Sequence, residues 1–204
     1  MSARRRSTGR PPAARRPARS RAASPRLGVV RGDPHAGRAL PPRAIGCAIL
    51  TVSDTRRGSE DRGGALAEEL LERAGVEIVR RAWSRDEAVA IRRVARALLA
   101  LDAVDALIVT GGTGMAARDV TPEAFAPLLE RTLPGFGELF RARSAEQVGA
   151  AAWFSRALAG VANGRLVVLL PGSPAAVELA LRELVLPELV HAVRLLGRFE
   201  TGET

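Results

Sequence analysis

The sequence predicts an α/β protein with a mostly parallel sheet between two layers of helices and one added β-hairpin. Three observations support this fold class. Apolar strand-like segments alternate with helix-like segments from Ile45 onward, the order that builds parallel βαβ units. Two of these strands are almost continuously apolar, as expected for strands covered on both faces. The loops that follow the strands are rich in glycine and polar residues, and ligands bind at such loops in open α/β sheets.

Composition divides the chain into two parts. Residues 1–43 hold twelve arginines and one acid with few large apolar side chains, so we expect a disordered Arg/Pro/Ala-rich tail. Residues 44–204 hold nineteen arginines against twenty-one acids, and we expect a single domain with one sizeable core there. The Arg-rich start lacks the apolar segment of a signal peptide, and no apolar run is long enough for a membrane span. The single Cys47 fits a reducing compartment, so the expected location is cytoplasmic.

The first strand and helix are read from their apolar patterns. Residues 45–52, "IGCAILTV", form a continuous apolar strand. Residues 63–75, "GGALAEELLERAG", carry apolar side chains at helical spacing, with Gly75 in place to end the helix. Residues 76–83, "VEIVRRAW", alternate as a second strand.

A second helix and a third strand follow. Residues 84–102 are expected to be helical, with Ser84 and Glu87 at the spacing of a capping box. Asp86 then falls in the first helical turn, where an acid complements the helix dipole. Residues 105–110, "DALIVT", form the third strand.

The second half of the chain mixes turns with shorter elements. Thr121 is expected to cap a helix whose first residue is Pro122, and another short helix is expected from about Gly137. After it, two strands are joined by Asn163-Gly164, a dipeptide typical of a type I′ hairpin turn.

The last two helices begin at prolines. Ser173 is expected to cap a helix that runs from Pro174 to about Val185, and a final helix is expected from Pro187. The helix N-terminus behind Ser173 also has the donors of an anion site.

A glycine-rich loop, "TGGTGMAARDVTPEA", follows the third strand at residues 110–124. Its glycines let backbone N–H groups approach a ligand closely, an arrangement suited to phosphate. Gly112, Gly114 and Ala117 match a dinucleotide-binding pattern, but that pattern belongs after the first strand and should open a helix at once. A Walker A loop is excluded because the chain contains no lysine, so any side-chain cation must be an arginine. Arg118 lies inside the loop; Arg62, Arg141 and Arg156 are further candidates, for which a solvated surface position is the favoured interpretation.

Asp119 has two interpretations on the residues alone. It can hydrogen-bond the backbone of its own turn, as Asp often does before a helix. It can equally serve as a Mg²⁺ ligand beside a phosphate-binding loop, since a hard cation prefers carboxylate oxygen. The chemistry of the sequence leaves both open.

Several separated motifs resemble the Mog/MoaB-type molybdopterin-binding family of molybdenum cofactor biosynthesis. They are "TVSDTRRGSEDRGG", "TGGTG…RDVTPEA", "PGFGELFR" and "SRALAGVANGRLVVLLPGSPAAVELAL", in this order, within residues 45 to about 195. The resemblance implies the molybdopterin-binding fold and transfer of AMP from Mg-ATP to the terminal phosphate of molybdopterin, with release of pyrophosphate. It also implies a cytoplasmic homotrimer or hexamer and a molybdate-inserting enzyme as partner.

The resemblance assigns roles to residues of this chain. It implies that Asp119 is the catalytic, Mg²⁺-associated acid and that Asp86 is the second functional acid. The substrate- and nucleotide-binding residues that it implies are Ser53, Asp54, Thr110, Gly111, Gly112, Thr113, Gly114, Arg118, Pro171, Gly172, Ser173 and Pro174.

Two other functions stay open at this point. A non-catalytic pterin-binding or scaffold protein would share the fold and bind molybdopterin without releasing pyrophosphate. Nucleic-acid binding through residues 1–43 would be sequence-independent and sensitive to salt.

Overall fold

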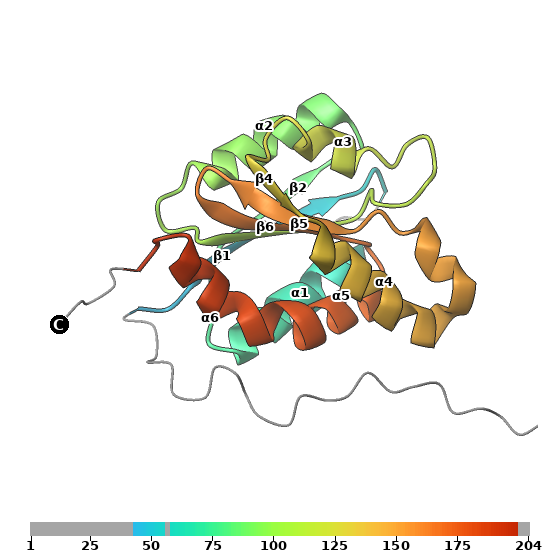
Figure 1. The fold of residues 1–204 in the computed structure, drawn as a ribbon. Coiled ribbons are helices and arrows are strands. Elements are labelled where there is room, and N and C mark those ends of the chain that lie inside the picture. Colours follow the sequence, from blue (N-terminus) through green and yellow to red (C-terminus); the bar gives the residue numbers. More distant parts are fainter. Residues whose placement is uncertain (1–42, 56–57, 200–204) are drawn as a thin grey trace, which may run out of the picture. The chain divides into compact units, whose positions relative to one another are not determined.

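The computed structural model describes residues 43–55 and 58–199, which form a six-stranded sheet with helices on both faces (Figure 1). The tail expected over residues 1–43 lies outside the described residues except for Arg43. The strands are β1 (Gly46–Val52), β2 (Glu77–Ser84), β3 (Ala106–Thr110), β4 (Arg131–Leu133), β5 (Leu158–Ala162) and β6 (Arg165–Leu170).

The helices follow the strands in the expected alternation. The α-helices are α1 (Arg62–Arg73), α2 (Ala88–Leu99), α3 (Thr121–Phe125), α4 (Pro134–Val148), α5 (Pro174–Ala180) and α6 (Leu186–Leu195). The short helical segments are η1 (Gly58–Glu60), η2 (Gly149–Phe154) and the π-helical η3 (Leu181–Val185).

The sheet runs in the order β2-β1-β3-β6-β5-β4. β2, β1, β3 and β6 are parallel, whereas β5 is antiparallel to β6 and β4 is antiparallel to β5. The chain passes from β1 outward to β2 and then back across to β3, so the order reverses between β1 and β3. At such a switch point the loops after neighbouring strands diverge, which leaves a crevice beyond their carboxyl ends.

Two hydrophobic cores cover the two faces of the sheet. One core packs α1, α4, α5 and α6 against one face, and the other packs α2 and α3 against the opposite face (Figure 1). Successive residues of β1 alternate between the cores, so that Ile49 lies in the first and Leu50 in the second, and both are fully buried. This double coverage is the reason that β1 is apolar without interruption.

The hairpin prediction is confirmed. Asn163 and Gly164 both have positive φ, at 50° and 66°, as a type I′ turn requires. Ser173 also caps α5 as expected, because its Oγ accepts a hydrogen bond from the N–H of Ala176 at 3.3 Å.

The predicted caps of two other helices are wrong. Ser84 ends β2, its hydroxyl donates to the carbonyl of Arg85, and α2 begins only at Ala88 without a side-chain cap. Asp86 therefore lies in the loop before α2 and not in its first turn. Thr121 is the first residue of α3, and its hydroxyl donates to the carbonyl of Gly111 at 2.9 Å. The hydroxyl of Ser84 is thus used by the adjoining residue, and that of Thr121 by the loop after β3, so neither caps a helix.

Two elements differ from the sequence pattern for tertiary reasons. The helix expected from about Gly137 begins at Pro134, and the strand β4 directly before it was not expected at all. β4 has only three residues, all exposed, and pairs with β5 at the edge of the sheet. Such a short edge strand leaves no apolar alternation to detect.

No helix in the described part of the chain is long and apolar enough to cross a bilayer. Cys47 is fully buried in β1, and burial raises the pKa of its thiol to about 12.

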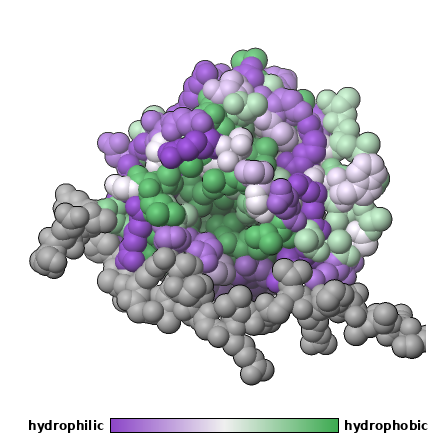
Figure 2. Space-filling model, in the orientation of Figure 1, coloured by the Kyte–Doolittle hydropathy of each residue, from purple (hydrophilic) through white to green (hydrophobic). Residues whose placement is uncertain are grey.

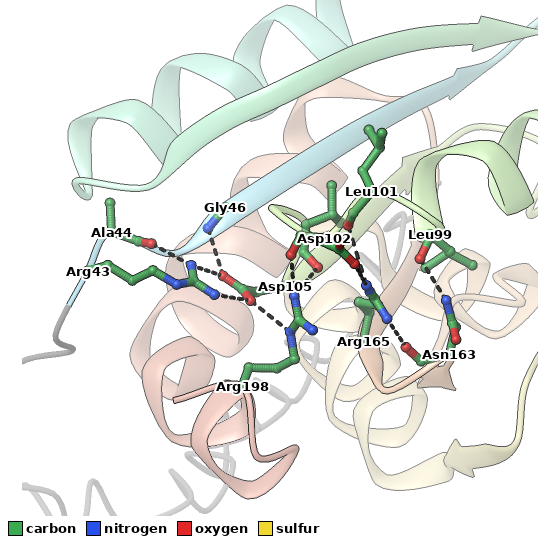
Figure 3. A network of polar contacts seen from close by, with 11 residues as sticks. Arg43, Ala44, Gly46, Leu99, Leu101, Asp102, Asp105, Asn163, Arg165 and Arg198 are labelled. Carbon is green, nitrogen blue, oxygen red and sulfur yellow. Dashed lines mark hydrogen bonds and ion pairs between the residues drawn. The ribbon is translucent and has the colours of Figure 1, made fainter. Parts of the chain in front are cut away.

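A buried carboxylate lies at the end of the sheet where β3 begins (Figure 3). Asp105 accepts hydrogen bonds from the guanidinium of Arg43 at 2.7 and 2.8 Å, from the N–H of Gly46 at 3.0 Å and from Arg198 Nε at 3.0 Å. Burial alone would raise the pKa of Asp105, but these donors lower it below its ordinary value. Arg43 also lies 5.3 Å above the ring of Phe199.

Candidate functional site

A cleft of about 630 Å³ lies beyond the carboxyl ends of β1, β3 and β6, at the switch point of the sheet. This volume falls within the range of roughly 300–1,000 Å³ that is common for small-molecule sites. Loops that leave β1, β2, β3 and β6 all contribute to its walls.

The floor of the cleft depends on close backbone contact at glycine. Gly111 has a φ of 101°, and a Cβ there would lie 2.1 Å from the carbonyl oxygen of Val52 in β1. Its N–H donates to the carbonyl of Leu170 in β6 at 2.9 Å. Gly111 therefore joins the ends of three strands at a point where no side chain fits.

Most residues singled out from the sequence line this cleft. They are Ser53, Asp54, Asp86, Thr110, Gly111, Gly112, Arg118, Asp119, Gly172, Ser173 and Pro174.

Three of the residues singled out from the sequence, Thr113, Gly114 and Pro171, do not line it. Thr113 is buried, and the carbonyl of Gly114 accepts a hydrogen bond from Arg156 Nε at 2.7 Å. Thr113 and Gly114 therefore anchor the glycine loop to the rest of the domain and do not face the cleft.

Asp86 and Asp119 approach each other at the mouth of the glycine loop. Asp86 Oδ1 lies 2.9 Å from the position that a Cβ on Gly112 would occupy. Burial raises the pKa of Asp86, and the nearby negative charge of Asp119 raises it further. Two carboxylates brought together in this way favour a cation or a shared proton between them.

Asp119 also holds the turn to which it belongs. Its Oδ2 accepts a hydrogen bond from the N–H of Ala116 at 2.9 Å, and its own N–H donates to the carbonyl of Ala116 at 2.8 Å. Both interpretations of this residue are thus compatible, because one carboxylate oxygen closes the turn while the side chain still lines the cleft.

Asp54 connects three of the loops around the cleft. Its Oδ1 accepts a hydrogen bond from the N–H of Asp86 at 3.0 Å, and its Oδ2 pairs with the guanidinium of Arg118. The loops after β1, β2 and β3 are therefore linked through one carboxylate. The adjoining Arg56 and Arg57 lie outside the described residues.

Asp61 is a cleft residue that the sequence analysis missed. It caps α1 by accepting a hydrogen bond from the N–H of Gly64 at 2.8 Å, and it also accepts from Thr51 Oγ1 at 2.6 Å and from Arg81 at 2.8 Å. An aspartate directly before a helix is a common N-cap signal, and this signal could have identified it. The other missed lining residues are Thr51, Val52, Thr55, Glu60 and Gly63.

The residues present fit a Mg²⁺ ion that is shared with a phosphate ligand. No group of three or more acidic, histidine or cysteine side chains is arranged to hold a metal within residues 43–55 and 58–199. Mg²⁺ commonly uses only one or two carboxylates and completes its shell with water and substrate phosphate. Asp86 and Asp119 can supply these carboxylates. In the same cleft, the buried Thr110 Oγ1 has no hydrogen-bond partner among the described residues.

Comparison with known proteins assigns the fold and the family. The profile of a family described as "Probable molybdopterin binding domain" matches residues 48–191. Molybdenum cofactor biosynthesis protein B of Staphylococcus carnosus is 50% identical over 154 residues, which cover 74% of this chain and 90% of that protein.

Solved structures show the same architecture. A crystal structure of molybdenum cofactor biosynthesis protein B has a TM-score of 0.75 and 40% identity, and the match covers 78% of this chain and 99% of that one. The tungsten cofactor synthesizing protein MoaB of Pyrococcus furiosus has a TM-score of 0.64 and 34% identity, with 76% and 98% covered.

Proposed function

The chain belongs to the probable molybdopterin binding domain family and is a protein of molybdenum cofactor biosynthesis, and we propose that it transfers AMP from ATP to molybdopterin. The observation that carries this proposal is the convergence of Asp86 and Asp119 beside the glycine loop in one cleft. A phosphate-binding backbone and two acids make a site for a metal-bridged polyphosphate.

The cleft needs a cation before it can accept ATP. Its described lining contains the carboxylates of Asp54, Glu60, Asp61, Asp86 and Asp119 and the guanidinium groups of Arg62 and Arg118. Asp54 already pairs with Arg118, which leaves little positive charge for a triphosphate. Mg²⁺, when bound, would supply charge neutralisation at the phosphate oxygens.

In the proposed reaction, a terminal phosphate oxygen of molybdopterin attacks the α-phosphorus of ATP. The new P–O bond forms as the bond from the α-phosphorus to the bridging oxygen of the β-phosphate breaks, and pyrophosphate leaves with that electron pair. In this proposal the chain positions the reactants: Gly111 and Gly112 line the cleft with backbone atoms, and Thr110 Oγ1 can bond a phosphate oxygen. Positioning and charge stabilisation suffice for phosphoryl chemistry of this kind.

Release of pyrophosphate from ATP and molybdopterin in the presence of Mg²⁺ tests the proposal. We expect turnover by the natural sequence and a fall of about 100- to 1,000-fold in kcat for Asp119→Asn, the usual scale for losing a group that stabilises transition-state charge. Asp102→Asn is the matched control, because this acid precedes β3 at the opposite end of the sheet and is fully exposed.

The same assay distinguishes the non-catalytic alternative. A pterin-binding or scaffold protein would bind molybdopterin in a titration and release no pyrophosphate at any Mg²⁺ concentration. That result with the unaltered protein would refute the proposed adenylyltransferase activity.

A further inference from the structure

One arginine outside the cleft contacts both ends of the 113–119 segment of the glycine loop. Arg156, in the segment between η2 and β5, donates from Nε to the carbonyl of Gly114 at 2.7 Å and from Nη2 to the carbonyl of Asp119. Its backbone N–H donates to the carbonyl of Thr113 at 2.9 Å, and its Nη1 pairs with Glu123 in α3. A single residue thus joins the start of the loop, its end and the helix that follows.

The loop has few other attachments. Residues 115–118 are exposed, and Met115 in particular is 70% exposed. The base of the loop is held by the bonds of Gly111 to Leu170 and of Thr121 to Gly111 and Gly112. Between residues 113 and 119, the other described bonds are the turn that Asp119 closes on Ala116 and the ion pair of Arg118 with Asp54. A segment with so little buried contact opens at a low free-energy cost unless a specific bond holds it.

We propose that Arg156 is a positioning residue whose hydrogen bonds hold the glycine loop in the conformation that binds the ligand. Because the carbonyl of Asp119 is one of its acceptors, Arg156 fixes the backbone that carries the proposed Mg²⁺ ligand. The effect on catalysis rests on the proposed adenylyl transfer, whereas the effect on the loop does not.

The chemistry of arginine suits this role. A planar guanidinium presents its donors in a fixed fork, so it can bridge two carbonyls and a carboxylate at once, which a lysine ammonium on a flexible stem does poorly. Hydrogen bonds from a charged donor are also about twice as strong as neutral ones. Arg156 Nε, Nη1 and Nη2 each have a different acceptor.

The test combines hydrogen exchange with ligand binding in Arg156→Lys and Glu123→Gln. We expect Arg156→Lys to speed amide exchange across residues 113–119 by about tenfold or more, since it loses charge-assisted hydrogen bonds. Glu123→Gln keeps the two carbonyl contacts and should give a smaller increase. Arg182→Lys is the matched control, because Arg182 pairs only on the surface with Glu178 at 3.0 Å.

Binding and turnover are measured on the same proteins. We expect Arg156→Lys to weaken Mg-ATP binding and to lower kcat/KM for pyrophosphate release by about tenfold or more. Amide exchange in the loop of Arg156→Lys at the rate of the unaltered protein would overturn the proposed role of Arg156. So would an equal rise in exchange through the whole domain, because Arg156 would then support the fold in general. If loop exchange rises in Arg156→Lys while the unaltered protein releases no pyrophosphate, the positioning role of Arg156 is supported and the proposed reaction is refuted.

Discussion

Asp105 shows how a single buried charge can organise a chain end. Its carboxylate is fully buried, yet it accepts hydrogen bonds from two guanidinium groups that come from opposite ends of the described chain, on Arg43 and Arg198. Removing one member of a buried pair leaves an uncompensated charge, whereas the pair itself is close to neutral in free energy. Replacing Asp105 should therefore lower the free energy of unfolding by more than the net contribution of its ion pairs.

Asp105→Asn tests this at the residue scale. We expect it to lower the free energy of unfolding by roughly 3 kcal/mol at pH 7, within the usual cost of breaking a buried pair. The folded-state pKa of Asp105 is lowered, so its contribution is present above the unfolded-state value of about 3.9 and is lost as pH falls through the folded-state value. Urea unfolding at pH 7 and below pH 4 should show the difference between the two proteins shrink in acid. A constant difference across this range would contradict the assignment.

Individual site residues were easier to predict than their local roles. Asp119 stands out in the sequence because an acid beside a glycine loop is electrostatically unusual, whereas Asp86 was singled out only through the family resemblance. Both line the cleft. The bond from the hydroxyl of Thr121 to the carbonyl of Gly111 could not be predicted, because its partner is ten residues away on the preceding loop. Arg156 was considered as a cation, but its contacts could not be predicted for the same reason, since its side-chain acceptors are 33 to 42 residues distant.

At the scale of elements, the loop after β3 depends on a glycine at one position. The φ of 101° at Gly111 is a conformation that other residues rarely adopt, and a Cβ there would lie 2.1 Å from the carbonyl oxygen of Val52. We expect Gly111→Ala to lower the free energy of unfolding by about 1–3 kcal/mol and to weaken Mg-ATP binding. Gly135→Ala is the control: nothing lies within 4 Å of its Cβ position in α4, so stability should be unchanged or slightly higher. Thermal unfolding of both variants decides this, and equal losses would be inconsistent with a special role for Gly111.

Strong periodicity made most elements predictable. β1 and β3 are continuously apolar because they lie in the middle of the sheet between two cores. β4 escaped prediction because pairing with β5, and not the local sequence, defines it. The start of α4 at Pro134 does carry a local signal, a proline in the first turn, which the prediction from about Gly137 did not use. The prediction that Ser84 caps α2 was wrong for a related reason. Parallel pairing with β1 extends β2 through Ser84, which lies opposite Val52.

For the molecule as a whole, the exposed hydrophobic residues are concentrated in one part of the chain. Figure 2 shows hydrophobic residues around a hollow at the centre of one face, over the region where β4, β5 and the start of α4 lie in Figure 1. Five large hydrophobic residues that are 42–71% exposed lie in β4, α4 and η2: Leu133, Leu139, Val148, Trp153 and Phe154. Trp153 and Phe154 also stack on each other, with ring centroids 4.6 Å apart.

We expect the chain to form a homotrimer or hexamer, and we expect the exposed hydrophobic residues of β4, α4 and η2 to take part in its assembly. Contiguous exposed apolar residues are typical of protein–protein interfaces, where tryptophan is especially enriched. Light scattering of the unaltered protein should give a mass of three or six chains, and Trp153→Glu should lower it. Val89→Glu is the control, because Val89 in α2 is equally exposed, at 71%, on the other side of the sheet. A monomeric unaltered protein would contradict the expectation.

The carboxylate of Asp105 has a further consequence for how this domain can be rearranged. Because it accepts hydrogen bonds from both Arg43 and Arg198, the first and last described segments lie side by side, at the end of the sheet away from the cleft. Domains whose first and last segments meet in this way tolerate circular permutation and insertion into a host protein. A short linker between these segments, with new ends opened at the Asn163-Gly164 hairpin, should therefore yield a permuted domain whose ligand pocket is intact.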